Sequence, residues 1–413
     1  MSTNEVLLTI AVIVLFGHFA QWIFRKTGVP DILLFLFIGF VMGPSIGKLV
    51  DPANLTLFAP VFTTFTLMFI MFNGSLYIDI KSFIRELPTS SGMSIVNYVL
   101  AVIVATGVFL LYGMPFMIAL FLGAALGGIS SSFVIPVLSE LKNQEGKPAK
   151  FECALTLESA FTDVLVIVIS LTVIEVSHTA FSLQSVLSQI VRLFAVAGVL
   201  GVAGGFIWIF LEKHIIERDR YYMMTIAYVV LVYLAAEYFD GNGAIAVMFM
   251  GIVMGNSPSL MPAVRKFYSS AEKGKEPEIT DDKIVSGRER LFYDEISSFL
   301  KTFIFVYIGI HLALDNTRSI FIACLLAVLY LITRHSSLLF TRDGSKRDRL
   351  LVNAMNARGL APAAVLLVAT QQGFITDPAC GDIVYWTIAT TIIVSSIMVM
   401  IYKRTRKTNV QVK

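Results

Sequence analysis

Apolar residues are gathered into long runs along this chain, and polar residues are largely confined to the short stretches between them. Many of the runs reach about 20 residues, the length that crosses the hydrocarbon core of a bilayer as an α-helix. The pattern predicts an all-α polytopic membrane protein with about 13 transmembrane helices. The predicted spans are 5–24, 30–48, 55–79, 92–112, 115–140, 152–176, 186–211, 220–239, 242–258, 295–315, 317–337, 346–371 and 381–402.

The composition fits a chain that lies mostly in a lipid bilayer. Hydrophobic residues make up 56% of the 413 residues and charged residues only 15%, whereas soluble domains carry about 25% charged residues. No sizeable soluble domain is expected. The net charge of +3 predicts no nucleic-acid partner. The cysteines Cys153, Cys324 and Cys380 lack metal-ligand spacing. No motif indicates an enzyme, and no cofactor is expected.

Charged residues set the expected orientation. Most of the 32 lysine and arginine residues fall in the loops after odd-numbered spans and in the C-terminal tail. The positive-inside rule places such loops in the cytoplasm, and an odd number of spans puts the two termini on opposite sides. We therefore expect a multi-pass cell-membrane protein whose N-terminus lies outside and whose C-terminus is cytoplasmic. The charged loop 259–294 is expected to be a cytoplasmic connector.

The order of the spans suggests an internal repeat. The first six and the last six spans form two sets, and the single span between them inverts the second set relative to the first. Inverted repeats are typical of secondary transporters, whose substrate site lies at the midplane between the repeats. We expect one transmembrane domain, 1–413, with repeat one at 1–176, a linking span at 186–211, repeat two at 220–402 and a basic tail at 403–413.

Glycine and proline interrupt the fifth span of each set. A broken helix frees backbone N–H and C=O groups, which a membrane tolerates only inside protein or beside water. The freed helix ends carry partial charges to the middle of the membrane. Interruptions at matching positions indicate the binding region of a transporter. The residues that predict them are Gly127, Gly128 and Pro136 in the first set and Gly359 and Pro362 in the second.

Two acids, Glu158 and Asp163, lie near the centre of the span 152–176. A charged side chain at that depth costs about 2.5 to 3.5 kcal/mol by insertion scales, so a chain that keeps one usually uses it to carry a proton or a cation. The acids are five residues apart, roughly 140° around a helix, and therefore face different neighbours. We expect Asp163 to bind the cation and the proton by turns, with a structural ion pair as the alternative.

Oxygen atoms near Asp163 supply candidate ligands for a monovalent cation, because hard cations prefer several oxygens. Ser159 lies one helical turn from Asp163, and Thr162 adjoins the same face. Ser131 and Ser132, beside the first interruption, offer hydroxyl groups. For these four the alternatives are bonding back to helix carbonyls or close helix packing. Asn73, at the end of the third span, is a further candidate ligand or an interhelical hydrogen bond.

Other buried charges are expected to have structural roles, with a direct part in transport as the alternative for the pair of Glu158 and Arg358. Arg358, in the second interruption, is the natural partner of Glu158, because a paired charge costs far less than a lone one. Arg334, near the end of its span, is expected either at the membrane interface or inside. Asp31 and Lys301 also lie near span ends and are expected at the interface.

Over nearly its whole length the chain resembles the monovalent cation/proton antiporter superfamily, and within it the sodium/proton exchanger family. The most specific likeness is Glu158-Ser-Ala-Phe-Thr-Asp163, which is similar to the Glu-Ser-x-x-Asn-Asp motif of the electroneutral branch. The segment from Gly127 to Pro136 resembles the unwound crossing helix, in a form nearer the Kef-type branch. Further likenesses are Thr27-Gly-Val-Pro-Asp31, Gly39-Phe-Val-Met-Gly-Pro44 and the run from Gly241 to Gly251.

The resemblance implies that Asp163 carries cation and proton, that Ser159 is a ligand and that Glu158 pairs with the arginine matching Arg358. It also implies a homodimer. This chain departs from the motif at Thr162, which replaces asparagine, and at Asn73, which replaces the third-span acid of some exchangers.

A lone acid predicts electroneutral exchange of about one Na⁺, Li⁺ or K⁺ per H⁺ by alternating access. The alternatives are a Kef-like K⁺/H⁺ antiporter or K⁺ efflux pathway, a Na⁺-coupled solute symporter, and a non-transporting membrane sensor.

Overall fold

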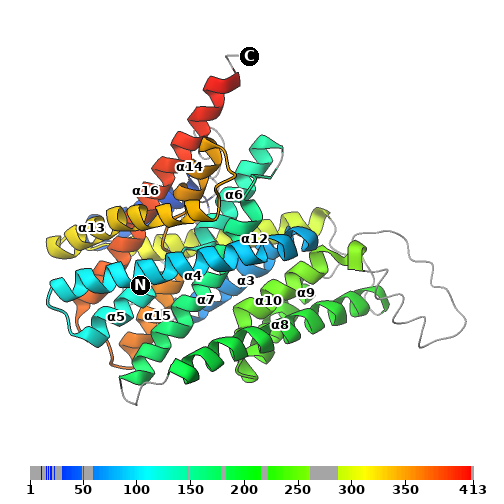
Figure 1. The fold of residues 1–413 in the computed structure, drawn as a ribbon, viewed down its shortest axis with the longest axis horizontal. Coiled ribbons are helices and arrows are strands. Elements are labelled where there is room, and N and C mark those ends of the chain that lie inside the picture. The colour runs from blue at the N-terminus through cyan, green and yellow to red at the C-terminus, as the bar shows by residue number, and fades with distance from the viewer. Residues whose placement is uncertain are drawn as a thin grey trace, which may run out of the picture. The chain divides into compact units, whose positions relative to one another are not determined.

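Every regular element in the described part of the chain is a helix in the computed structural model (Figure 1). The structure describes residues 30–48, 50, 59–146, 148–177, 183–214, 222–260 and 287–410, with scattered positions between 11 and 23. The helices are α2 (Asp31–Met42), α3 (Ala59–Ser75), α4 (Ile80–Leu111), α5 (Phe116–Ala125), α6 (Ser131–Glu145), α7 (Glu152–Val176), α8 (Leu183–His214), α9 (Tyr222–Tyr238), α10 (Gly243–Gly255), α12 (Gly287–Ile310), α13 (Thr317–Arg334), η2 (His335–Leu339), α14 (Lys346–Ala354), α15 (Leu360–Gln371) and α16 (Pro378–Val410).

The predicted all-α class is confirmed, and each predicted span from the second onward overlaps a described helix. Two spans contain a pair of short helices instead of one long helix: α5 and α6 in 115–140, and α14 and α15 in 346–371. Five described helices are long and apolar enough to cross a membrane, and the remaining apolar helices are shorter. The first predicted span lies almost wholly outside the described residues, as does most of the loop 259–294.

The chain divides into two compact units. Unit 1 comprises Met1–Leu67, Glu86–Ser182 and Ser298–Lys413. Unit 2 comprises Met68–Arg85 and Leu183–Ser297. Both broken helices and α7 therefore belong to unit 1, whereas α8, α9 and α10 belong to unit 2.

Within unit 1, α7 is the most completely enclosed of the long helices. It packs against α5, α6 and α15, so both interruptions lie beside it. Its run of leucine, valine and isoleucine is free of glycine and proline, which allows an unbroken helix. At its start the Glu152 carboxylate accepts a hydrogen bond from the N–H of Ala149, in the segment before the helix, at 3.2 Å. The bounds of α7 are those predicted.

The α2–α12 contact in unit 1 corrects one expectation. A Cβ atom on Gly39 would lie 2.1 Å from the carbonyl oxygen of Val306, so only glycine permits this approach of the two backbones. At the start of α2, the Lys301 ammonium lies 2.6 Å from the Asp31 carboxylate. Asp31 and Lys301 are both buried, so they form an internal ion pair instead of facing the membrane interface.

Small residues also bring the helices of unit 2 together. A Cβ atom on Gly201 of α8 would lie 2.1 Å from the carbonyl oxygen of Ala246 in α10. On the same helix α10, Gly251 faces Ser75 at the end of α3, and Gly255 faces the backbone of Leu76. Such contacts are typical of helix packing in membranes, where close backbone approach replaces the hydrophobic driving force.

Candidate functional site

The two helix interruptions of unit 1 meet each other. The first lies between α5 and α6, and the second between α14 and α15. The N–H of Ser130 donates to the carbonyl oxygen of Ala357 at 2.9 Å, which joins the two extended segments. A Cβ atom on Gly359 would lie 1.9 Å from Ser130 Oγ, so the second segment can approach the first only because residue 359 is glycine.

The breaks fall where the glycines predicted them, but the two prolines lie outside the interruptions. Gly127 and Gly128 precede α6, and Gly359 precedes α15. Pro136 lies in the second turn of α6, after the interruption. Pro362 lies in the first turn of α15, where a missing N–H deprives the helix of no internal hydrogen bond.

Asp163 lies on α7 beside the start of α6 and is only 4% exposed. The N–H of Ser131 donates to its Oδ2 at 3.2 Å, and the hydroxyl of Ser131 donates to the same oxygen. Ser131 is the first residue of α6, so the carboxylate faces the positive end of that helix. Within the described part of the chain, no donor contacts Oδ1 and no lysine or arginine forms an ion pair with Asp163.

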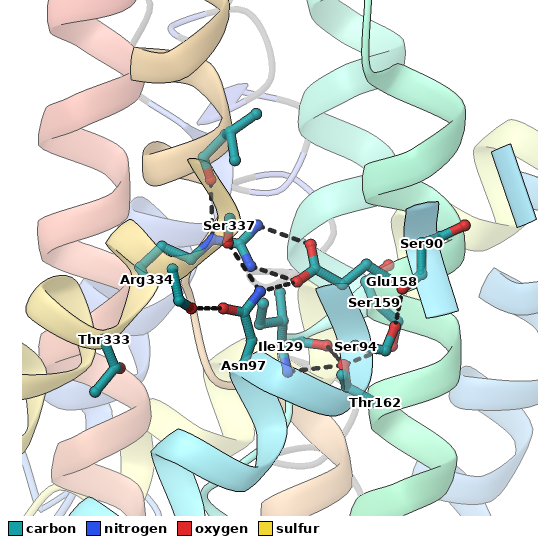
Figure 2. Close-up of polar contacts among 12 residues, drawn as sticks. Ser90, Ser94, Asn97, Ile129, Glu158, Ser159, Thr162, Thr333, Arg334 and Ser337 are labelled. Atoms are coloured by element: carbon teal, nitrogen blue, oxygen red, sulfur yellow. Dashed lines mark hydrogen bonds and ion pairs between the residues drawn. The ribbon is translucent and has the colours of Figure 1, made fainter. Parts of the chain in front are cut away.

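Thr162 holds the first interruption in place. Its hydroxyl oxygen accepts a hydrogen bond from the N–H of Ile129 at 3.0 Å, and its proton faces the carbonyl oxygens of Ser159 and Ile129 at 3.2 and 3.3 Å (Figure 2). The freed N–H of the broken helix is thereby satisfied. Gly128 permits this contact, because a Cβ atom there would lie 2.9 Å from the Thr162 carbonyl oxygen.

The other predicted hydroxyl ligands also bond within the site. The Ser159 hydroxyl donates to the carbonyl oxygen of Thr156 at 2.8 Å. The hydroxyl oxygens of Ser130 and Ser132 lie 2.8 Å apart. Ser159, Ser131, Ser132 and Thr162 are all buried in unit 1. Each hydroxyl oxygen has two acceptor lone pairs, and Thr162 uses one of them to accept from Ile129.

The predicted pairing of Glu158 with Arg358 is wrong. Glu158 is fully buried, and its two carboxylate oxygens accept from the Nη1 and Nη2 of Arg334 at 2.5 and 2.8 Å (Figure 2). Asn97 of α4 adds a third donor at 2.5 Å, and the Nε of Arg334 donates to the carbonyl oxygen of Val352 at 3.0 Å. Arg334, at the end of α13, therefore lies inside the protein and neutralises Glu158.

Arg358 has a different role because its guanidinium faces backbone carbonyls. Its Nη1 donates to the carbonyl oxygens of Gly127 and Gly128 at 3.0 and 2.7 Å, just after the end of α5. The guanidinium also lies 4.1 Å from the centre of the Tyr330 ring. A positive charge thus complements the negative end of α5, as the Asp163 carboxylate complements the positive end of α6.

Sequence reasoning missed Asn97, Ser337 and Tyr330. The Asn97 amide donates to the Ser337 hydroxyl at 2.8 Å as well as to Glu158, and its oxygen accepts from Ser336 at 2.6 Å. An asparagine within the apolar run 92–112 was the available signal, because an unpaired amide there is costly. No group of three or more histidine, cysteine, aspartate or glutamate residues that could hold a metal ion occurs among the described residues.

Asn73 belongs to unit 2, where its amide nitrogen donates to the Asp294 carboxylate at 2.9 Å. The structure thus gives Asn73 a carboxylate neighbour that sequence reasoning did not identify. Asp163 and the predicted serine and threonine ligands lie in unit 1.

Comparison with known proteins places this arrangement in a family. The family model described as "Sodium/hydrogen exchanger, transmembrane" matches residues 10–403, which is nearly the whole chain. The chain belongs to the sodium/hydrogen exchanger family. As a member of this family it is a multi-pass membrane protein of a transporter class.

The matches to individual proteins agree with the family. The chain is 24% identical over 369 residues to Na(+)/H(+) antiporter 1 of Methanocaldococcus jannaschii, covering 84% of this chain and 79% of that relative. It is 26% identical over 264 residues to the K(+)/H(+) antiporter NhaP of Alkalimonas amylolytica, covering 62% of this chain and 45% of that relative. The chain therefore spans less than half the length of the second relative.

A solved structure has the same fold. The sodium proton antiporter MjNhaP1 from Methanocaldococcus jannaschii at pH 8 matches with a TM-score of 0.72 and 20% sequence identity. The match covers 97% of this chain and all of the other. The exchanger fold of this sodium/hydrogen exchanger family member is thereby confirmed.

Proposed function

We propose that this protein exchanges a monovalent cation, Na⁺ in the first place, for H⁺ across a membrane. The observation that carries the proposal is the environment of Asp163. This buried carboxylate lies where two broken helices meet, accepts hydrogen bonds only from neutral donors of Ser131, and has no cationic partner among the described residues. Such a carboxylate is free to take up a small cation or a proton.

Competition for one carboxylate accounts for obligatory exchange. Asp163 holds either a proton or one cation, and either of them neutralises it. The neutral, loaded site changes sides readily, whereas the empty site carries a charge whose burial is costly. The hydroxyl oxygens of Ser131, Ser132, Ser159 and Thr162 complete the proposed cation shell, because hard cations prefer oxygen ligands. One cation then moves for each proton.

The remaining features of the proposal concern the whole molecule. The chain forms one transmembrane domain of two inverted repeats, 1–176 and 220–402, joined by the span 186–211. The N-terminus is outside, the C-terminus is cytoplasmic, and two subunits pair. No cofactor takes part and no reaction is catalysed. The basic loops after odd-numbered spans and the family relationship support this arrangement.

Proteoliposomes that contain the purified protein and a trapped pH-sensitive dye test the proposal. Addition of Na⁺ is expected to drive protons across the membrane of vesicles that contain the wild-type protein. It is expected to have no effect on vesicles that contain the Asp163→Asn variant. Because a charge that crosses 100 mV gains about 2.3 kcal/mol, an electrogenic cycle responds steeply to voltage. We expect the rate to change little when the membrane potential is clamped at different values. Strong voltage dependence would reject one-for-one exchange.

K⁺/H⁺ exchange is the second candidate function. It is supported by the relative from Alkalimonas amylolytica, which is named a K(+)/H(+) antiporter. Serines 130–132 at the first interruption are uncharged, and Ser131 donates to Asp163. Asp163 is then the acid that would bind the ion where the two broken helices meet. The same dye assay with Na⁺, Li⁺ and K⁺ at matched concentrations separates the candidates, because the transported ion releases protons at the lowest concentration.

A further inference from the structure

Three basic side chains gather where α14 begins in unit 1, and we call Arg342, Lys346 and Arg349 the basic cluster. All three are exposed. Lys346 and Arg349 are three residues apart at the start of α14 and therefore lie on the same side of the helix. The Nη2 of Arg349 donates to the carbonyl oxygen of Arg342 at 2.9 Å, which holds the preceding loop against the helix. Three positive charges are thus close together on one short surface.

The acids beside the basic cluster are engaged with other groups. The Asp343 carboxylate lies 2.8 Å from the Lys150 ammonium. The Asp348 carboxylate accepts from the N–H and the hydroxyl of Ser345 at 2.9 and 2.8 Å, as part of the N-terminal cap of α14. Within the described part of the chain, no acid forms an ion pair with a member of the basic cluster. Such a surface favours an anion as its ligand.

Exposed aliphatic side chains lie next to the basic cluster. Leu339 ends η2, three residues before Arg342, and is 57% exposed. The helix α14 packs against both η2 and the last part of α16 (Figure 1). In that part of α16, Ile401 is 46% exposed, and the centre of the Tyr402 ring lies 4.3 Å from the Arg347 guanidinium carbon. Apolar and basic side chains beside each other are typical of the level where the hydrocarbon core of a bilayer meets its head groups.

We propose that the basic cluster binds the phosphate head group of an anionic phospholipid, whose acyl chains lie along Leu339 and Ile401. Clusters of lysine and arginine directly beside a membrane helix attract anionic lipids. A free phosphate would use the positive charge alone and leave both aliphatic side chains exposed to water, so these side chains favour a lipid as the occupant. The charge distribution along the chain predicts that this end of unit 1 is cytoplasmic, which assigns the lipid to the inner leaflet.

Such a lipid connects the membrane surface to the second interruption. The helix α14 ends directly before that interruption, and its Val352 carbonyl oxygen accepts from the Nε of Arg334 at 3.0 Å. Arg334 in turn pairs with Glu158 of α7. A head group that holds the start of α14 therefore stabilises the arrangement around the proposed exchange site. Only this consequence rests on the proposed function, since lipid binding itself does not require transport.

Thermal unfolding in an uncharged detergent tests the lipid site. Added phosphatidylglycerol is expected to raise the thermal midpoint of the wild-type protein, whereas phosphatidylcholine with the same acyl chains is not. The triple variant Arg342→Gln/Lys346→Gln/Arg349→Gln is expected to need at least about tenfold more phosphatidylglycerol for the same rise, because each basic residue near the membrane surface adds to the attraction. An equal response of the triple variant and the wild type would overturn the inference.

Matched controls separate the basic cluster from general effects of charge. Lys81→Gln/Arg288→Gln/Arg318→Gln removes three exposed charges elsewhere in the chain and is expected to respond to the lipid as the wild type does. Glycerol 3-phosphate, a soluble analogue of the head group, is expected to give no rise at the same concentration. A rise equal to that with the lipid would overturn the lipid as the occupant.

A milder variant keeps the test decisive if the triple variant does not fold, as judged by size-exclusion chromatography. Lys346→Gln alone then replaces it and is expected to raise the phosphatidylglycerol requirement about threefold, because two of the three positive charges remain. An unchanged requirement in this variant would also overturn the lipid site.

Proton flux in proteoliposomes separates this inference from the proposed function. Wild-type protein in phosphatidylcholine with phosphatidylglycerol is expected to exchange Na⁺ for H⁺ faster than in phosphatidylcholine alone, and the triple variant is expected to lose that difference. The same gain in the triple variant would overturn the link between the basic cluster and exchange. Absence of Na⁺-driven flux in all vesicles, together with a thermal shift that depends on the basic cluster, would overturn the proposed function and leave the lipid site standing.

Discussion

The two acids of α7 lie five residues apart on one buried helix, yet their surroundings are opposite. Glu158 accepts two hydrogen bonds from Arg334 and one from Asn97, so its charge is fully matched. Asp163 accepts hydrogen bonds only from the N–H and hydroxyl of Ser131 at the start of α6. Burial therefore does not distinguish the proposed transport carboxylate from a structural one, whereas the charge of its partner does.

The partner of each carboxylate determines how readily a cation or a proton can bind to that carboxylate in its place. Breaking a buried ion pair costs about 3 to 5 kcal/mol, so neither a proton nor Na⁺ displaces Arg334 easily. A helix N-terminus contributes only about half an elementary charge. Asp163 is thus held in position by donors that leave most of its negative charge uncompensated. The same helix thus combines a charge fixed by an ion pair with one that we propose to be exchangeable.

The largest effect is expected at the exchangeable acid. Asp163→Asn keeps the shape of the side chain and removes the charge that binds either ion, so we expect complete loss of exchange in the proteoliposome dye assay. The thermal midpoint in detergent is expected to stay near that of the wild type, since no ion pair is broken. Residual exchange in this variant would mean that another group carries the proton.

The opposite outcome is expected at the fixed acid. Glu158→Ala leaves Arg334 buried without a counter-charge, which is expected to lower the free energy of unfolding by about 3 to 5 kcal/mol. Thermal unfolding in detergent measures the loss. Glu158→Leu combined with Arg334→Met is expected to recover much of it, because apolar residues can replace a buried pair at little cost. The double variant should also retain exchange, and its complete inactivity would break the contrast between the two acids.

The sequence predicted where the helices lie better than it predicted which charges meet. The bounds of α7 and both interruptions follow from local features, namely an apolar run without glycine or proline and glycines at the breaks. The partner of Glu158 does not, because Arg334 and Arg358 both lie in apolar spans and only the packing of α13 against its neighbours selects one. The contact of Asn73 with Asp294 joins residues 221 positions apart and has the same origin.

A smaller effect is expected at Thr162, which connects the exchangeable acid to the broken helix. Thr162→Val preserves shape but leaves the N–H of Ile129 without its acceptor, at a cost of about 1 to 3 kcal/mol. Misplacement of Ser131 relative to Asp163 is then expected to slow exchange about tenfold, since 1.4 kcal/mol in a barrier is about tenfold in rate. Thr162→Ser retains the hydroxyl and is the matched control. A valine variant with the wild-type rate would show that the interruption holds without this contact.

The smallest effect is expected at Ser159 and concerns affinity alone. Its hydroxyl proton is donated to the carbonyl oxygen of Thr156, so its lone pairs point away from that bond and remain available to a cation. Loss of one neutral ligand in Ser159→Ala is expected to raise the half-saturating Na⁺ concentration about threefold, which corresponds to well under 1.4 kcal/mol. Neither the maximal rate nor the thermal midpoint is expected to change, because the hydroxyl bonds only within its own helix. Ser159→Thr should restore the affinity. Unchanged half-saturation in Ser159→Ala would remove Ser159 from the cation shell and leave Asp163 with the hydroxyl oxygens of Ser131, Ser132 and Thr162.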